Sequence, residues 1–316
     1  MPVSTHNTAH ENINILYSYM IVYLKMIWDM ISTQFHNSIY IYKKTGIFYE
    51  PLSPLPTVPY ENNIKVLSYN IDDLACHRHQ YTTKDQARAT EIIKYLESTN
   101  ADIICLQEVW GETMKQELLD AFIAKNYYVA LPPWRKNYFF GENSGLMTIS
   151  KYPIITQTFI PFNNARGTCR LFNKGVQYCH IRVPNSNPQT SIEFNIANTH
   201  LQASFGSYLN YYLTAKDQLN TIINDCPYES CLLVGDLNLT QNQLEDFIKN
   251  EQNIQYFGEN TEVTFSGCDD RLDYVLTITK LLKTKDFINI ENKTESHIKL
   301  SDHFPIISEL KLNTDN

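Results

Sequence analysis

Short apolar runs alternate with amphipathic segments along most of the chain. Between the runs, apolar residues three and four positions apart predict helices at Lys84 to Ser98, Glu112 to Ala124 and Leu209 to Asn224. The runs themselves are bounded by polar or turn-forming residues and predict buried strands. They are Ile64 to Tyr69, Ile103 to Leu106, Phe194 to Ala197, Cys231 to Val234 and Tyr274 to Ile278. Strands alternating with helices predict a layered domain with a functional rim where strands end.

Six polar patches adjoin these runs, and we expect each to close a strand at that rim. A lone Asn, Asp or His after a strand is ordinarily a turn former or a structural residue. Together, the six contain four carboxylates, four carboxamides and two imidazoles, which predicts a catalytic site instead. The patches are Ser68-Tyr69-Asn70, Leu106-Gln107-Glu108-Val109-Trp110, Asn198-Thr199-His200-Leu201, Gly235-Asp236-Leu237-Asn238, Arg271-Leu272-Asp273-Tyr274 and Ser301-Asp302-His303-Phe304-Pro305.

These residue types suit metal-assisted cleavage of a phosphodiester. The reaction needs an attacking water, stabilisation of the negative charge on the non-bridging oxygens and a proton for the leaving oxygen. Carboxylate and amide oxygens suit Mg2+, which keeps several waters and takes one or two carboxylates. Glu108 is the best single candidate ligand, and Asn70 and Asp302 are candidates to complete the shell directly or through water. We therefore expect Mg2+, with Mn2+ as the alternative.

The remaining patches supply candidates for the acid-base chemistry. His303 is the candidate base, because an imidazole with a pKa near neutrality can activate water when a partner fixes its tautomer. Asp273 is the candidate for that orienting carboxylate. Asp236 and Asn238, on one turn, are candidates to hold the water and a phosphate oxygen. His200 is expected to face the developing charge from the opposite side.

The six patches resemble, in kind and in order, the motifs of the endonuclease/exonuclease/phosphatase superfamily, which has the DNase I-like fold. The resemblance extends over nearly everything after about residue 60. It implies an α+β fold, a four-layer α/β/β/α sandwich. It also implies that Glu108 with Asn70 binds Mg2+ and that Asn238 with His200 contacts the phosphate, while the other residues keep the roles given above.

Two further segments are similar to the neutral sphingomyelinase branch of this superfamily. Ser144 to Ile154 reads as a Ser-Gly-apolar stretch followed by Ser-Lys-x-Pro-Ile, and Lys174 begins a Lys-Gly-Val segment. From its neighbours alone Lys174 is a solvated loop lysine, whereas the resemblance implies that it brings a charge to the phosphate. The resemblance thus implies hydrolysis of a phospholipid headgroup ester. The alternatives are a nuclease or DNA-repair phosphodiesterase of abasic-site, exonuclease or tyrosyl-DNA type, and, less favoured, a non-catalytic scaffold.

Charge and cysteine content refine this interpretation. The chain has 26 Lys and Arg against 34 Asp and Glu, a formal charge of -8, and no basic stripe. Long nucleic acids are usually bound through Lys and Arg, so lipid is favoured over nucleic acid as the phosphodiester substrate. Seven cysteines, an odd number without metal-type spacing, indicate a reducing compartment. Asn238 begins a glycosylation sequon, and a glycan at this candidate site residue would block the site, which disfavours passage through a secretory route. Both observations predict a cytoplasmic protein, with membrane association as an option. No protein partner is implied.

The chain is expected to contain one catalytic domain, residues 60–316, behind an extension (1–49) and a proline-rich linker (50–59). Residues 13–35 are apolar except for one narrow stripe, which predicts a helix that either packs on the domain or faces a membrane. Lys25 and Asp29 disfavour a transmembrane span. The aromatic and basic segment 132–140 is likewise a candidate for peripheral membrane contact or for ordinary loop packing.

Overall fold

A computed structural model of the protein describes residues 47–49, 63–73, 83–133, 143–184, 191–203, 208–249, 251, 253–256, 262–267, 270–280 and 287–312. The predicted N-terminal helix, the proline-rich linker and most of segment 132–140 lie outside these residues, so those three expectations stay predictions. None of the helices in the described ranges combines the length and the apolar character needed to cross a membrane.

The described strands form two mixed sheets. The first has the order β1-β4-β5-β3-β2-β13-β12 and the second the order β10-β11-β9-β8-β7-β6. The first contains β1 (Ile47–Tyr49), β2 (Ile64–Asn70), β3 (Ile103–Gln107), β4 (Tyr128–Leu131), β5 (Met147–Ser150), β12 (Phe287–Thr294) and β13 (Ile306–Leu312). The second contains β6 (Ile154–Pro161), β7 (Gly175–Pro184), β8 (Ser191–His200), β9 (Ser230–Asp236), β10 (Ile254–Tyr256) and β11 (Asp273–Thr279).

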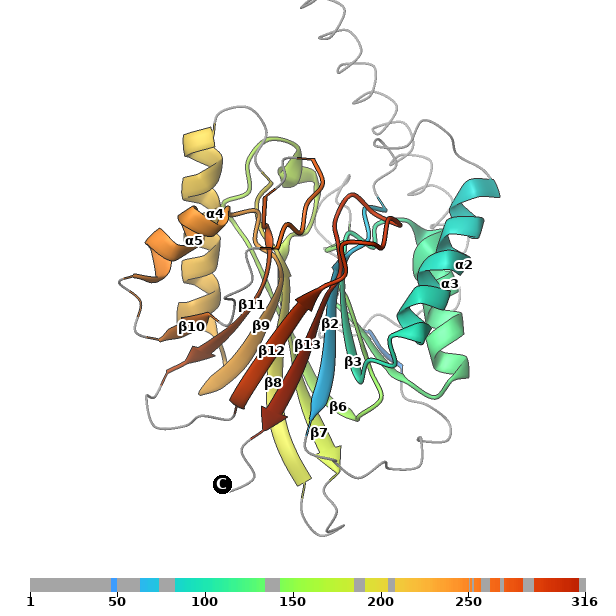
Figure 1. Cartoon of the computed structure of the whole chain (residues 1–316). Helices are drawn as coiled ribbons and strands as arrows, with labels where there is room; N and C mark the ends of the chain where they lie inside the picture. Colours follow the sequence, from blue (N-terminus) through green and yellow to red (C-terminus); the bar gives the residue numbers. More distant parts are fainter. Residues whose placement is uncertain are drawn as a thin grey trace, which may run out of the picture.

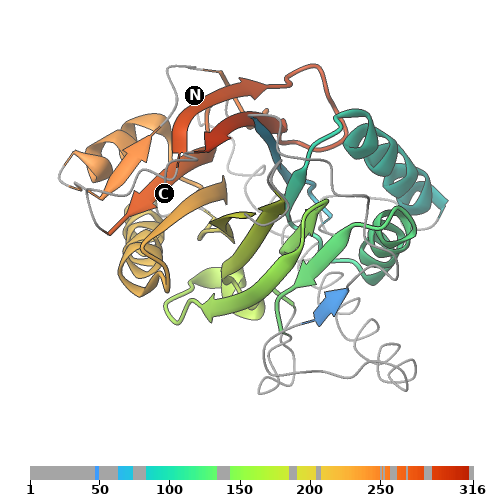
Figure 2. The ribbon, with the colours of Figure 1, turned by 90° about the horizontal axis from the view of Figure 1, so that it is seen from below.

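Helices cover the outer face of each sheet. Helices α2 (Thr83–Ser98) and α3 (Glu112–Ala124) lie against the first sheet, and α4 (Tyr208–Asp225) and α5 (Gln241–Ile248) lie against the second (Figures 1 and 2). A 3-10 turn, η2 (Gly167–Leu171), lies between β6 and β7. The expected four-layer α/β/β/α sandwich is confirmed. The three predicted helices are correct to within one residue at each end.

Three apolar layers hold the sandwich together. Val66 and Val234 belong to the layer between the two sheets. Leu67, the next residue on β2, faces the layer under α2 and α3, because successive side chains of a strand point to opposite faces. A third layer, which includes Leu233, lies under α4 and α5. Strands buried on both faces explain why the sequence shows continuous apolar runs there rather than alternation.

Pairing of the strands brings the polar residues to one rim. β2 and β3 are parallel, as are β8 and β9, so Asn70 lies beside Gln107 and His200 lies beside Asp236 at the carboxyl ends. The expectation that every patch closes a strand is wrong for Asp273, which opens β11, and for Asp302 and His303, which precede β13. Because β11 runs antiparallel to β9, Asp273 pairs with Asp236 and still reaches the same rim.

Candidate active site

Amide side chains join the two sheets beneath the rim. Gln107 Nε2 donates to Asn198 Oδ1 at 2.8 Å, and Asn198 Nδ2 donates to the carbonyls of Leu106 and Met147. Both amide side chains are fully buried. The sequence placed Gln107 and Asn198 inside two of the patches but assigned them no role, since strand ends give no sign of which residue will face the opposite sheet.

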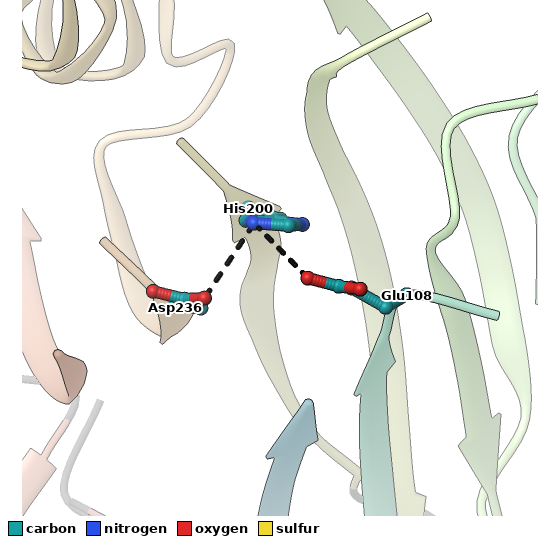
Figure 3. Close-up of side chains that lie close together, drawn as sticks. All are labelled: Glu108, His200 and Asp236. Carbon is teal, nitrogen blue, oxygen red and sulfur yellow. Dashed lines mark ion pairs between the residues drawn. The ribbon is translucent and has the colours of Figure 1, made fainter. Parts of the chain in front are cut away.

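Two carboxylates and an imidazole converge above this bond. Ligand atoms of Glu108, His200 and Asp236 lie within 4.8 Å of one another. His200 Nε2 is 3.7 Å from Glu108 Oε1 and 3.5 Å from Asp236 Oδ2 (Figure 3). Glu108 follows β3 with a positive φ of 58°, a conformation that few non-glycine residues adopt. The backbone N–H of Val109 is held by the carbonyl of Gly145 at 2.9 Å, which fixes this turn.

Asn70 ties these two carboxylates together. Its Nδ2 donates to Glu108 Oε1 at 3.1 Å and to Asp236 Oδ2 at 3.0 Å, while its Oδ1 accepts from the Asp72 N–H. In this arrangement Asn70 is a donor that spans the gap between the sheets. Its expected role as an oxygen ligand of Mg2+ stays a prediction.

His303 and Asp273 form a second group at the rim. His303 Nδ1 is 2.7 Å from Asp273 Oδ2, and His303 Nε2 is 3.6 Å from Asp236 Oδ2. All three side chains are buried. Burial lowers the pKa of His303, but the carboxylates of Asp273 and Asp236 outweigh it, and with Asp302 they raise the pKa to about 10. Asp273 is therefore placed as expected of an orienting carboxylate.

Burial also shifts the pKa values of the other ionisable groups at the rim. It raises the pKa of Glu108, with the charge of Asp72 adding to the effect, and it raises the pKa of Asp236 to about 7. Burial, then the positive charges of Lys174 and His303, hold the pKa of His200 well below its ordinary value. Perturbed titratable groups of this kind gather at functional sites.

The donor set fits a divalent cation. Glu108 and Asp236 offer hard oxygen ligands, and burial raises the pKa of both carboxyl groups. His200 Nδ1 is buried without a hydrogen-bond partner among the described residues, which leaves one polar atom for a ligand, substrate or water. A cation would offset the cost of burying these two charges.

Lys174 and Asn238 meet at one backbone carbonyl. Lys174 Nζ donates to the Leu201 carbonyl at 2.7 Å, and Asn238 Nδ2 donates to the same oxygen at 3.3 Å. The interpretation of Lys174 as a solvated loop lysine is wrong, because the residue is only 3% exposed and directly precedes β7. An ammonium keeps further donors after one hydrogen bond. The two predicted phosphate contacts therefore lie side by side.

Asp302 is less clearly part of this centre. Its carboxylate accepts from Ser301 Oγ at 3.3 Å, and it belongs to neither of the two groups of close ligand atoms in the described ranges. Its role as a metal ligand stays a prediction. Trp110, by contrast, touches the centre although no role was assigned to it: its Nε1 donates to Glu108 Oε2 at 3.3 Å, and its ring packs on Phe172 at 4.4 Å between centroids.

Residues 67–303 match the Endonuclease/Exonuclease/phosphatase family. The chain belongs to this family. Its members act on phosphoric ester bonds, so the expectation of a hydrolase of phosphoric esters is confirmed. A sphingomyelinase from Dictyostelium discoideum is 31% identical over 163 residues, which are 46% of this chain and 33% of that protein. The match thus spans about a third of the relative's length.

Solved structures share the fold at low sequence identity. A Staphylococcus aureus beta toxin variant with bound magnesium ions aligns with a TM-score of 0.58 and 20% identity, over 78% of this chain and 99% of that one. Sphingomyelinase C from Streptomyces griseocarneus gives 0.57 and 18%, with the same coverage. A humanized D. rerio TDP2 gives 0.60 and 14%, over 79% and 99%. The DNase I-like fold is therefore confirmed.

Proposed function

We propose that the protein is a Mg2+-dependent phosphodiesterase that hydrolyses the headgroup ester of a phospholipid, in the manner of a sphingomyelinase. The observation that carries the proposal is the meeting of two side-chain groups at Asp236. Glu108 and His200 lie on one side of it, and the His303–Asp273 pair lies on the other. One group suits a cation and the phosphate, and the other suits proton transfer.

His303 is the group that exchanges protons with the attacking water. Asp273 accepts a hydrogen bond from the Nδ1–H of His303, so His303 Nε2 is the nitrogen that exchanges the proton with water. Asp236 lies 3.6 Å from that nitrogen and accepts the Asn238 N–H on its other oxygen at 2.8 Å, so its position is fixed for holding water. Glu108 would hold a cation that would supply positive charge to the phosphate oxygens and, by offsetting the neighbouring carboxylates, would lower the pKa of His303 towards neutrality.

Lys174, Asn238 and His200 are the proposed phosphate contacts. The Lys174 ammonium provides the positive charge, the Asn238 amide a neutral donor, and His200 its Nε2, which faces Glu108 and Asp236. Charged donors make the stronger hydrogen bonds to phosphate oxygens. Asn70 and Asp302 are proposed to complete the metal shell, directly or through water.

A lipid substrate is supported by the sphingomyelinase from Dictyostelium discoideum and by the chain's net charge of -8. The similarity to TDP2 favours the second candidate, a DNA-repair phosphodiesterase, and the same side chains would serve it. For the lipid enzyme we propose a cytoplasmic location, peripheral membrane contact through residues 13–35 and 132–140, and residues 60–316 as the catalytic domain.

The decisive experiment compares substrates under one set of conditions. Mg2+-dependent hydrolysis of sphingomyelin in mixed micelles is measured beside abasic-site, single-stranded and tyrosyl-linked DNA, with Glu108→Ala as the blank. Sphingomyelin turnover that disappears in the blank supports the proposal. DNA cleavage without lipid turnover would move the function to nucleic acid, and no turnover of either with no Mg2+ uptake would leave a scaffold.

A further inference from the structure

A short segment outside all six patches lies against both members of the His303–Asp273 pair. Residues 262–267 follow β10 and contain the pair Thr264–Phe265, with Thr264 fully buried. The segment forms no regular strand, and only isolated bridges join Phe265 to Asp270 and to His303. The pattern of apolar residues in the sequence did not predict a role for this segment.

Thr264 holds the start of the strand that carries Asp273. Its Oγ1 accepts two backbone N–H groups, from Leu272 at 2.9 Å and from Asp273 at 3.0 Å. Its own N–H donates to the Asp270 carbonyl at 3.1 Å. Because one hydroxyl receives both amides, it determines where β11 begins and where the Asp273 carboxylate stands. A buried hydroxyl with two such partners is hard to replace.

The other side of the same segment holds His303. The Phe304 N–H donates to the Thr264 carbonyl at 2.8 Å, and the Ser266 N–H donates to the Asp302 carbonyl at 2.9 Å. These bonds bracket His303 on both sides. The Phe265 ring also packs on the imidazole, with centroids 4.7 Å apart and planes tilted by 42°.

We propose that Thr264 and Phe265 are positioning residues for the proton-transferring pair. Asp273 and His303 are thirty residues apart in sequence, and Thr264 bonds directly to the backbone at both places. Thr264 thus sets the position of the carboxylate relative to the ring, and Phe265 sets the tilt of the ring. The inference rests on the proposed function, in which this pair moves the proton; a misplaced group costs rate even when binding is intact.

The test compares Thr264→Val, which keeps the shape but removes the acceptor, with Thr264→Ser, which keeps the hydroxyl. The control is Thr99→Val. Thr99 Oγ1 also accepts a backbone N–H, from Ala101 at 3.2 Å. Thr99, however, lies shortly before the first residue of β3, and the rim is at the other end of that strand. At a temperature where all variants are folded, Thr264→Val should lower kcat by about 10- to 100-fold with KM and Mg2+ affinity unchanged. Thr264→Ser should stay within about threefold of wild type.

A second readout does not depend on turnover. In the folded protein the His303 Nδ1 proton should give a downfield NMR signal, assigned by its loss in His303→Asn. The signal should be lost or shifted in Thr264→Val and kept in Thr264→Ser and Thr99→Val. If wild type hydrolyses no phosphodiester, the proposed function fails while this signal still decides the positioning role.

Phe265→Ala provides the same test should Thr264→Val fail to fold, because Phe265 is only half-buried. We expect it to lower kcat by about tenfold and to shift the His303 signal. The proposal is overturned if the kcat and the His303 signal of the folded Thr264 or Phe265 variants match those of Thr99→Val. It is equally overturned if Thr264→Ser loses as much kcat as Thr264→Val.

Discussion

Gln107 donates a hydrogen bond to Asn198 across the space between the two sheets, over 2.8 Å and away from solvent. Gln107 directly precedes Glu108, and Asn198 lies two residues before His200. One amide pair therefore fixes the separation between a candidate metal ligand on the first sheet and the imidazole that faces it from the second. This hydrogen bond therefore positions Glu108 and His200 through the backbone that joins each of them to an amide residue.

The first prediction concerns that bond. Gln107→Met should lower the free energy of unfolding by about 1–3 kcal/mol, because Asn198 Oδ1 loses its donor. It should also weaken Mg2+ binding about tenfold, since the support of a metal ligand is lost. Urea denaturation and calorimetric Mg2+ titration measure the two effects.

Gln157→Met is the matched control for this change. Gln157 is a buried amide at the far end of a chain of side-chain hydrogen bonds that runs from Asn198 through Thr148 and Gln177, and its Nε2 donates to the Leu131 carbonyl at 2.8 Å. We expect a similar loss of stability with unchanged Mg2+ affinity. Equal loss of Mg2+ affinity in both variants would contradict a local role for Gln107.

A second prediction concerns the metal. Saturating Mg2+ should raise the melting temperature of the wild type, because a ligand present at about 100 times its Kd stabilises the native state by about 2.7 kcal/mol. Glu108→Gln should abolish this shift. Glu91→Gln, at a solvent-exposed side chain on α2, should leave it unchanged. A full Mg2+ shift in Glu108→Gln would remove Glu108 from the ligand set.

The third prediction separates the two members of the proton-transferring pair. His303→Asn should lower kcat by about 10²- to 10⁴-fold, the usual contribution of a general acid or base. Asp273→Asn should lower kcat less, because the base stays but loses its orienting partner. His297→Asn, at an exposed ring, is the control. Activity of His303→Asn within a few-fold of wild type would show that another group is the base.

Stability should depend on pH through His303. Its pKa is raised from 6.5 to about 10 in the folded, metal-free protein. A raised pKa means that the native state holds the proton more tightly than the unfolded state. The resulting stabilisation is complete below about pH 6.5 and is lost as the pH rises to about 10.

Urea denaturation in EDTA measures this dependence. The difference in unfolding free energy between wild type and His303→Asn should shrink steadily between pH 6.5 and pH 10. A constant difference over that range would mean that His303 is not held protonated by Asp273 and Asp236.

The fifth prediction concerns Lys174. Lys174→Met keeps most of the buried stem but removes the charge, so KM should rise about tenfold, in line with about 1.5 kcal/mol for a hydrogen bond to a charged group. Lys151→Met is the control, because Lys151 pairs with Asp102 where β3 begins, away from the rim. An unchanged KM in Lys174→Met would leave that lysine a purely structural role.

Local sequence determined much of the architecture. The apolar runs around Val66 and Val234 specify strands buried on both faces, and the periodicity of residues 112–124 specifies α3. Both follow from short-range rules, namely short apolar runs bounded by turn-forming residues for the strands and the 3.6-residue repeat for the helix. The chemistry of Glu108 and His303 was also readable, because few side-chain types can hold Mg2+ or exchange a proton near neutral pH.

Tertiary structure alone decided how the parts meet. Asp273 reaches the rim because β11 runs antiparallel to β9, and strand direction is not written in a local pattern. Lys174 is buried because its ammonium finds the Leu201 carbonyl, a partner 27 residues away. The Thr264 carbonyl accepts the N–H of Phe304, 40 residues further along the chain. Such contacts depend on the packing of two sheets, so no local rule could have placed them.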